Sequence, residues 1–62
     1  MKKVQFTVKC NPAQNQYTIV APKGYEQYSG QFTNLADLMK RITQITSELR
    51  RKNVKAVFHF EY

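Results

Sequence analysis

Apolar residues recur at helical spacing between Asn34 and Lys52, the longest periodic stretch of the chain. They fall at i, i+3, i+4 and i+7, which is the spacing of one face of an α-helix. The members of this helix stripe are Leu35, Leu38, Met39, Ile42, Ile45, Thr46 and Leu49. The pattern predicts an amphipathic helix whose stripe lies on an apolar surface of the same domain.

Residues at both ends of this stretch are typical of helix termini. Asn34 can accept a hydrogen bond from a free backbone N–H of the first turn, and Asp37 suits the positive end of the helix dipole. Arg50, Arg51 and Lys52 fall in the last turn, where cations are favoured. Asn53 can adopt the left-handed conformation that ends a helix. Both ends therefore support the predicted helix.

Polar and apolar residues alternate in three other stretches, and each predicts a strand with one buried face. Residues 3–10 and 16–21 flank the turn-forming residues 11–15, so we expect a β-hairpin. Residues 54–62 alternate over their whole length and form the predicted last strand.

The stretch between the hairpin and the helix allows two interpretations. Tyr28, Gly30 and Phe32 are spaced two residues apart and would lie on one face of a strand, which favours a short irregular strand. Alternatively, Tyr25, Tyr28 and Phe32 fill the core from an ordered loop. We expect the short strand, at about residues 26–31.

The order of these elements predicts an α+β fold with two layers, β-β-(short β)-α-β, in which one helix packs on a small, mainly antiparallel sheet. Residues 1–62 form a single domain. If a right-handed crossover through the helix places the last strand beside the first, the first strand is central, and we expect antiparallel neighbours on both of its sides. The large residues of the helix stripe are expected to be buried against the sheet. Their expected partners are Val4, Phe6, Val8, Ile19, Phe58 and Phe60.

A single helix covers only one face of the sheet, so the opposite face is predicted to be uncovered. Such a solvated face is normal for antiparallel sheets. The residues of this parity are Lys3, Gln5, Thr7, Lys9, Thr18, Val20, Lys55, Val57, His59 and Glu61. A candidate interaction surface on this face consists of Lys3, Gln5, Lys9, Val20, Lys55, Val57 and His59.

The charge balance favours anionic partners. The chain of 62 residues has ten Lys and Arg residues and four Asp and Glu residues, which gives a net charge of +6. Nucleic acid or an acidic protein surface suits this balance, although excess charge also serves solubility. A candidate basic helix face consists of Lys40, Arg41, Arg50 and Arg51.

The sequence offers no catalytic constellation. Cys10 is the only cysteine, which excludes an internal disulfide and a cysteine-rich zinc site. Cys10 and His59 could form a nucleophile and base pair, but their parities place them on opposite faces of the sheet. We expect neither an enzyme nor a bound cofactor or metal, and no small-molecule substrate is evident.

No apolar run approaches the roughly 18 residues of a membrane span, and Met1 leads through Lys2 and Lys3 into an alternating strand pattern. We therefore expect a soluble, cytoplasmic protein with no membrane partner. Small domains without disulfides or metals often gain stability by oligomerising, which favours a homodimer.

Three short segments carry a family resemblance. They are residues 17–22, which read Tyr-Thr-Ile-Val-Ala-Pro, residues 29–33 after Gly24, and residues 35–38. In these segments the chain resembles the N-terminal domain of HicB-like antitoxins, in which a hairpin ends at a proline, a glycine-bearing loop follows, and a Thr-capped helix packs on the sheet. The resemblance implies a small sheet and helix module that makes protein contacts.

Two functional hypotheses follow. The first is a non-enzymatic interaction or regulatory module that works as a homodimer through a sheet edge or the uncovered face, and residues 54–62 are the candidate edge strand. The second is a nucleic-acid-binding module that uses Lys3, Lys9 and Lys55 together with the basic helix face. Tyrosines could add base stacking to the second hypothesis.

Overall fold

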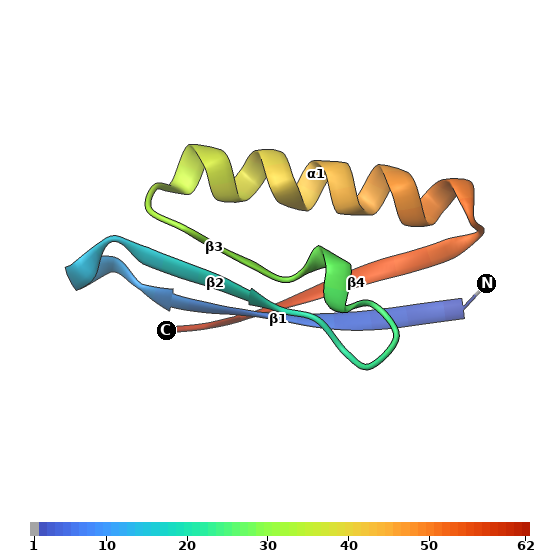
Figure 1. Ribbon diagram of the computed structural model, residues 1–62, viewed down its shortest axis with the longest axis horizontal. Coiled ribbons are helices and arrows are strands. Elements are labelled where there is room, and N and C mark those ends of the chain that lie inside the picture. The colour runs from blue at the N-terminus through green and yellow to red at the C-terminus, as the bar shows by residue number, and fades with distance from the viewer. Residues whose placement is uncertain (1) are drawn as a thin grey trace.

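A four-stranded sheet with a helix on one face makes up residues 2–62, which the computed structural model describes (Figure 1). The strands and the helix are β1 (Lys2–Asn11), β2 (Gln16–Val20), β3 (Gly30–Phe32), α1 (Leu35–Arg51) and β4 (Val54–Glu61). Short 3-10 turns span Pro12–Gln14 (η1) and Glu26–Tyr28 (η2). This two-layer α+β arrangement confirms the predicted fold class.

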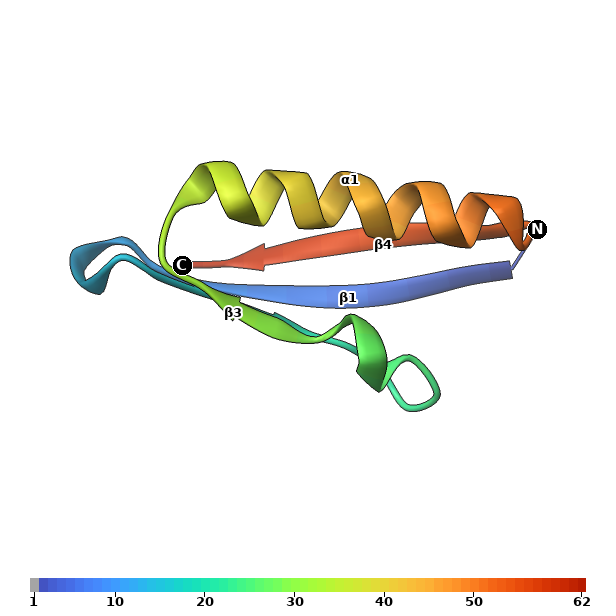
Figure 2. The ribbon, with the colours of Figure 1, turned by 45° about the horizontal axis from the view of Figure 1, so that its top comes forward.

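The sheet has the order β3-β2-β1-β4, so β1 and β2 are the inner strands. β2 pairs antiparallel with both β1 and β3, whereas β4 pairs with β1 in parallel. The prediction that β1 has antiparallel neighbours on both sides is therefore wrong. Since β3 already runs in the direction of β1, α1 has to return the chain to the start of β1, and β4 then runs alongside β1 (Figure 2).

The ends of α1 confirm the predicted caps. The Asn34 side chain accepts a hydrogen bond from the N–H of Asp37 at 2.8 Å and donates one to the Asp37 carboxylate at 2.9 Å. At the other end the N–H of Asn53 donates to the carbonyl of Arg50 at 3.0 Å, and Asn53 has a φ of 61°. The left-handed residue turns the chain directly into β4.

The core lies between α1 and the face of the sheet that α1 covers. Phe6 is at its centre and is fully buried. Its ring stacks on the ring of Phe58, with the two ring centroids 5.2 Å apart. It meets the rings of Tyr25 and Tyr28 edge-on, at centroid distances of 6.3 and 6.2 Å. The buried apolar residues are Val4, Phe6, Val8, Ile19, Tyr28, Leu38, Ile45 and Leu49.

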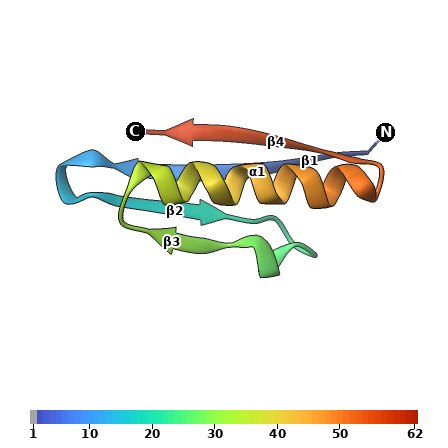
Figure 3. The ribbon, with the colours of Figure 1, turned by 90° about the horizontal axis from the view of Figure 1, so that it is seen from above.

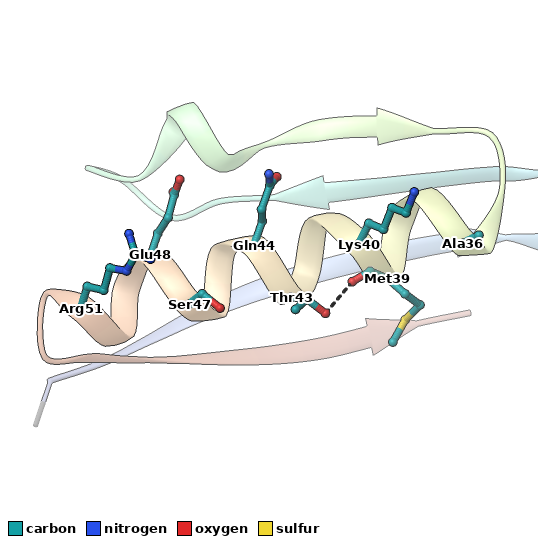
Figure 4. Close-up of a pocket in the computed structure, with 8 residues that line it drawn as sticks. All are labelled: Ala36, Met39, Lys40, Thr43, Gln44, Ser47, Glu48 and Arg51. Atoms are coloured by element: carbon teal, nitrogen blue, oxygen red, sulfur yellow. Dashed lines mark hydrogen bonds between the residues drawn. The ribbon is translucent and has the colours of Figure 1, made fainter.

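Burial of the helix stripe is only partial, so the prediction that all its large residues are buried is wrong. Leu38, Ile45 and Leu49 are fully buried, but Leu35 is 55% exposed and Met39 is 48% exposed. Viewed from above, α1 lies over β1, with β4 as the last strand on one side (Figure 3). Met39 lies on the flank of α1 toward β4, the last strand on that side (Figure 4), and Leu35 shares this flank because it lies four residues earlier in the helix.

The segment between β2 and α1 combines the two interpretations drawn from the sequence. A strand over residues 26–31 is wrong in part, because η2 occupies its first half and β3 begins only at Gly30. Tyr28 instead fills the core, as the loop interpretation predicted, and is 4% exposed. The guanidinium of Arg41 donates to the carbonyl of Gln27 at 3.2 Å and lies 5.9 Å from the centre of the Tyr28 ring. This contact fixes the loop against α1.

Candidate functional site

The candidate interaction surface predicted from the sequence does lie on one face of the sheet. The pairing of β1 with β4 sets Lys3 beside Lys55 and Gln5 beside Val57. The two apolar residues of this surface are far apart, however, because Val20 lies on β2 and Val57 lies on β4, with β1 between them. The residues of this surface, Lys3, Gln5, Lys9, Val20, Lys55, Val57 and His59, are all exposed. The surface is therefore polar, with no continuous apolar centre.

The candidate basic helix face does not form one patch. Arg41 is turned toward the loop, where it contacts Gln27 and Tyr28. Arg50 lies on the β4 side of α1 and lines a groove with the first residues of β4. Lys40 and Arg51 instead line a shallow hollow on the outer surface of α1 (Figure 4).

The hollow on the outer surface of α1 has no geometry for enclosing a ligand. All the residues that line it belong to α1, and Figure 4 shows their side chains spreading apart from the helix. Side chains that diverge from one helix in this way cannot bury most of a small molecule, as ligand sites do. The lining residues are Ala36, Met39, Lys40, Thr43, Gln44, Ser47, Glu48 and Arg51.

β4 presents a long edge. It ends the sheet on one side, and within residues 2–62 no strand pairs with its outer edge over the stretch Val54–Glu61 (Figure 3). The opposite edge of the sheet is β3, which has three residues against eight in β4. The backbone N–H and C=O groups along the outer side of β4 are consequently available to another strand.

Exposed apolar side chains accompany this edge. Phe60 is 37% exposed and Tyr62 is 91% exposed. On α1, Figure 4 shows Met39 on the β4 side of the helix, and the exposed Leu35 lies four residues earlier on the same helix face. We call the outer edge of β4 together with these four side chains the β4-edge site. The sequence placed Leu35, Met39 and Phe60 in the core, so it identified the strand but missed the apolar part of the site.

Cys10 and His59 are not brought together. Cys10 is half-buried on the face that α1 covers, and its thiol lies 3.9 Å from the carbonyl of Val8. His59 is exposed on the opposite face of the sheet, where it pairs with Thr7 of β1. Residues 2–62 contain no group of three or more His, Cys, Asp or Glu side chains that could hold a metal ion. Over the same residues, no helix has the length and apolar character to cross a membrane.

Positive charge gathers at one end of the molecule. The start of β1, the start of β4 and the last turn of α1 meet there (Figure 1). The cations of these three segments are Lys2, Lys3, Arg50, Arg51, Lys52 and Lys55. We call this set the cationic end. Lys9 of the predicted basic set lies elsewhere, beside Glu61 at the far end of β4.

Comparison with known proteins finds no family model, curated protein or solved structure that matches this chain. The resemblance to HicB-like antitoxins therefore stays a prediction.

Proposed function

We propose that this protein is a small, cytoplasmic, non-enzymatic interaction module that works as a homodimer through the β4-edge site. The observation that carries the proposal is the outer edge of β4, which pairs with no strand among residues 2–62 and is flanked by exposed apolar side chains. Free N–H and C=O groups on such an edge form main-chain hydrogen bonds with an added strand. Apolar side chains beside them gain further free energy when the added strand excludes water.

The edge suits association better than the uncovered face. The uncovered face carries lysines and amides, and a solvated polar face is normal for an antiparallel sheet. A long β-prone edge, by contrast, is the feature that proteins usually shorten, cover or interrupt. Two copies of β4 can pair antiparallel about a two-fold axis, which joins the two sheets and keeps both helices on one face.

Analytical ultracentrifugation over a concentration series tests the proposal. We expect the wild-type chain to dimerise, and Phe60→Lys to raise the dimer Kd because it places a charge at the edge. The matched control is Val20→Lys, since Val20 has a similar exposed fraction (42% against 37%) but lies on β2. A wild-type chain that stays monomeric at millimolar concentration would refute the proposal, and weakening by Val20→Lys alone would place the interface on the uncovered face.

A second candidate function, nucleic-acid binding, is favoured by the cationic end. Clustered lysines and arginines release counterions from phosphates, so binding of this kind weakens steeply with salt. A gel-shift salt series with Lys3→Gln and Lys55→Gln tests it. Each substitution should lower the slope of log K against log salt by about 0.7–0.9 if it removes one phosphate contact.

Lys40→Gln is the control for these two variants, because Lys40 lies on the outer surface of α1, away from the cationic end. It should leave the salt slope unchanged. Equal effects of all three substitutions would indicate an unspecific charge effect, and no binding at low salt would refute this second function.

A further inference from the structure

We infer that the second copy binds the β4-edge site in one register, in which Phe58 of one copy lies opposite Phe58 of the other. The inference rests on the proposed homodimer and adds which residues recognise each other. Two independent features of the strand and its surroundings support this register: the placement of its charges, and the fit of Tyr62 to a groove.

Symmetry limits the number of registers. When a strand pairs antiparallel with its own copy about a two-fold axis, each residue faces a partner on the same face of the sheet. The axis therefore passes between two identical residues. When Tyr62 is counted together with β4 (Val54–Glu61), the registers with long overlap are centred on Val57, Phe58 or His59. Of these, the one centred on Phe58 pairs the stretch from position 54 to position 62 completely.

The charges of β4 favour the register centred on Phe58. Lys55 lies near the start of the strand and Glu61 at its end, and both are exposed on the uncovered face. In this register Lys55 of each copy faces Glu61 of the other, so the symmetry creates two pairs of opposite charge. Directly opposite ions of opposite sign stabilise a strand pair, and like charges destabilise it.

The two neighbouring registers lose these pairs. If the axis passes between the two copies of Val57, Lys55 faces His59, and if it passes between the two copies of His59, Glu61 faces Val57. The strand is thus self-complementary in charge in only one of the three alignments, and opposite charges directly across a strand pair favour that alignment.

Tyr62 supports the same register from the other face of the sheet. It is 91% exposed and has the parity of the side that α1 covers. In the register centred on Phe58 it lies opposite Val54 of the second copy. Val54 lines a groove between the last turns of α1 and the start of β4, and Arg50 also lines it. The aromatic ring therefore reaches an apolar floor with a guanidinium beside it, which suits a tyrosine.

Charge reversal tests the register. Lys55→Glu alone and Glu61→Lys alone each place like charges opposite one another twice in the dimer, so we expect each to raise the dimer Kd about tenfold. The double variant Lys55→Glu/Glu61→Lys restores both pairs and should dimerise within about threefold of the wild-type Kd. An equimolar mixture of the two single variants should form heterodimers by the same pairing. Sedimentation of each sample gives its Kd, and circular dichroism checks that each variant is folded.

The outcomes separate the register from the proposed function. If the single variants have a raised dimer Kd, and both the double variant and the mixture regain a Kd close to that of the wild type, the register centred on Phe58 is supported. A wild-type dimer whose single variants are unchanged, or whose mixture fails to recover, overturns the register and leaves the homodimer in place. A wild-type chain that is monomeric throughout overturns both.

Discussion

Substitution of Met39, a residue of the β4-edge site, can separate association from folding. Met39 is 48% exposed and lies on the β4 side of the helix (Figure 4). In two copies joined through β4, the two β1 strands lie about 14 Å apart, because three strand spacings of roughly 4.8 Å separate them. Since α1 lies over β1 (Figure 3), the two helices leave a gap between them that long side chains can fill. Met39 of each copy is directed into this gap.

The structure gives the size of the effect. Complete burial of a methionine side chain is worth about 1.5–3 kcal/mol, so covering the exposed half of Met39 contributes about 0.7–1.5 kcal/mol. Two-fold symmetry counts this contribution twice, and the substitution Met39→Gln should raise the dimer Kd about 10- to 100-fold. Gln keeps the length and the helix propensity of Met. The free energy of unfolding of the monomer should therefore change by less than about 1 kcal/mol.

Two measurements on the same samples check this prediction. Sedimentation equilibrium gives the dimer Kd, and urea denaturation at a concentration well below that Kd gives the stability of the monomer. Val20→Thr is the control, because Val20 is 42% exposed but lies on β2, and Thr keeps its branched shape. The reasoning fails if Met39→Gln leaves the Kd within twofold of wild type, or if Val20→Thr weakens the dimer as much.

Three further variants test the core, the helix cap and the groove. Phe6→Ala should cost about 3–5 kcal/mol of folding free energy, which approaches the whole stability of about 3–9 kcal/mol expected for this length. Circular dichroism should therefore show an unfolded or barely folded chain, whereas Phe6→Leu should stay folded. A stably folded Phe6→Ala variant would contradict the central position of the ring. Asn34→Ala should lower Tm by about 4–8 °C for a loss of about 1 kcal/mol, whereas Asn34→Ser should retain the cap because its hydroxyl can accept from the Asp37 N–H without adding a second carboxylate beside Asp37; equal Tm values for both would argue against the cap. Tyr62→Ala should raise the dimer Kd about tenfold in sedimentation experiments because the ring leaves the groove of the second copy, while Tyr62→Phe should have little effect; an unchanged Kd for Tyr62→Ala would argue against the groove.

Local signals in the sequence account for most of the elements. The cap residues Asn34 and Asp37 and the left-handed Asn53 predicted α1 to within one residue at each end. Alternation predicted β1, β2 and β4 and the composition of the uncovered face. These features depend on residues close in sequence, which single-sequence patterns record well.

What the sequence did not predict depends on the arrangement of elements. Periodicity shows that Leu35 and Met39 share a stripe with Leu38, but it does not show where the sheet beneath the helix ends. The direction of β4 beside β1 was missed for a similar reason, since it follows from the direction of β3. In η2, Tyr28 is held by contacts with Phe6 and Arg41, both distant in sequence. The sequence missed the apolar part of the β4-edge site because it predicted that Leu35 and Met39 are buried.

The difference between the two edges of the sheet explains why association through β4 would stop at two copies. Pairing β4 with its own copy consumes both long edges and leaves β3 of each copy as the outer strand. β3 has only three residues, and short edge strands are poor templates for further pairing. An isologous contact of this kind also closes on itself, whereas a head-to-tail contact between β4 and β3 would leave free edges for continued growth. The opposite charges at Lys55 and Glu61 favour the closed arrangement, because they complement each other within one strand and its copy.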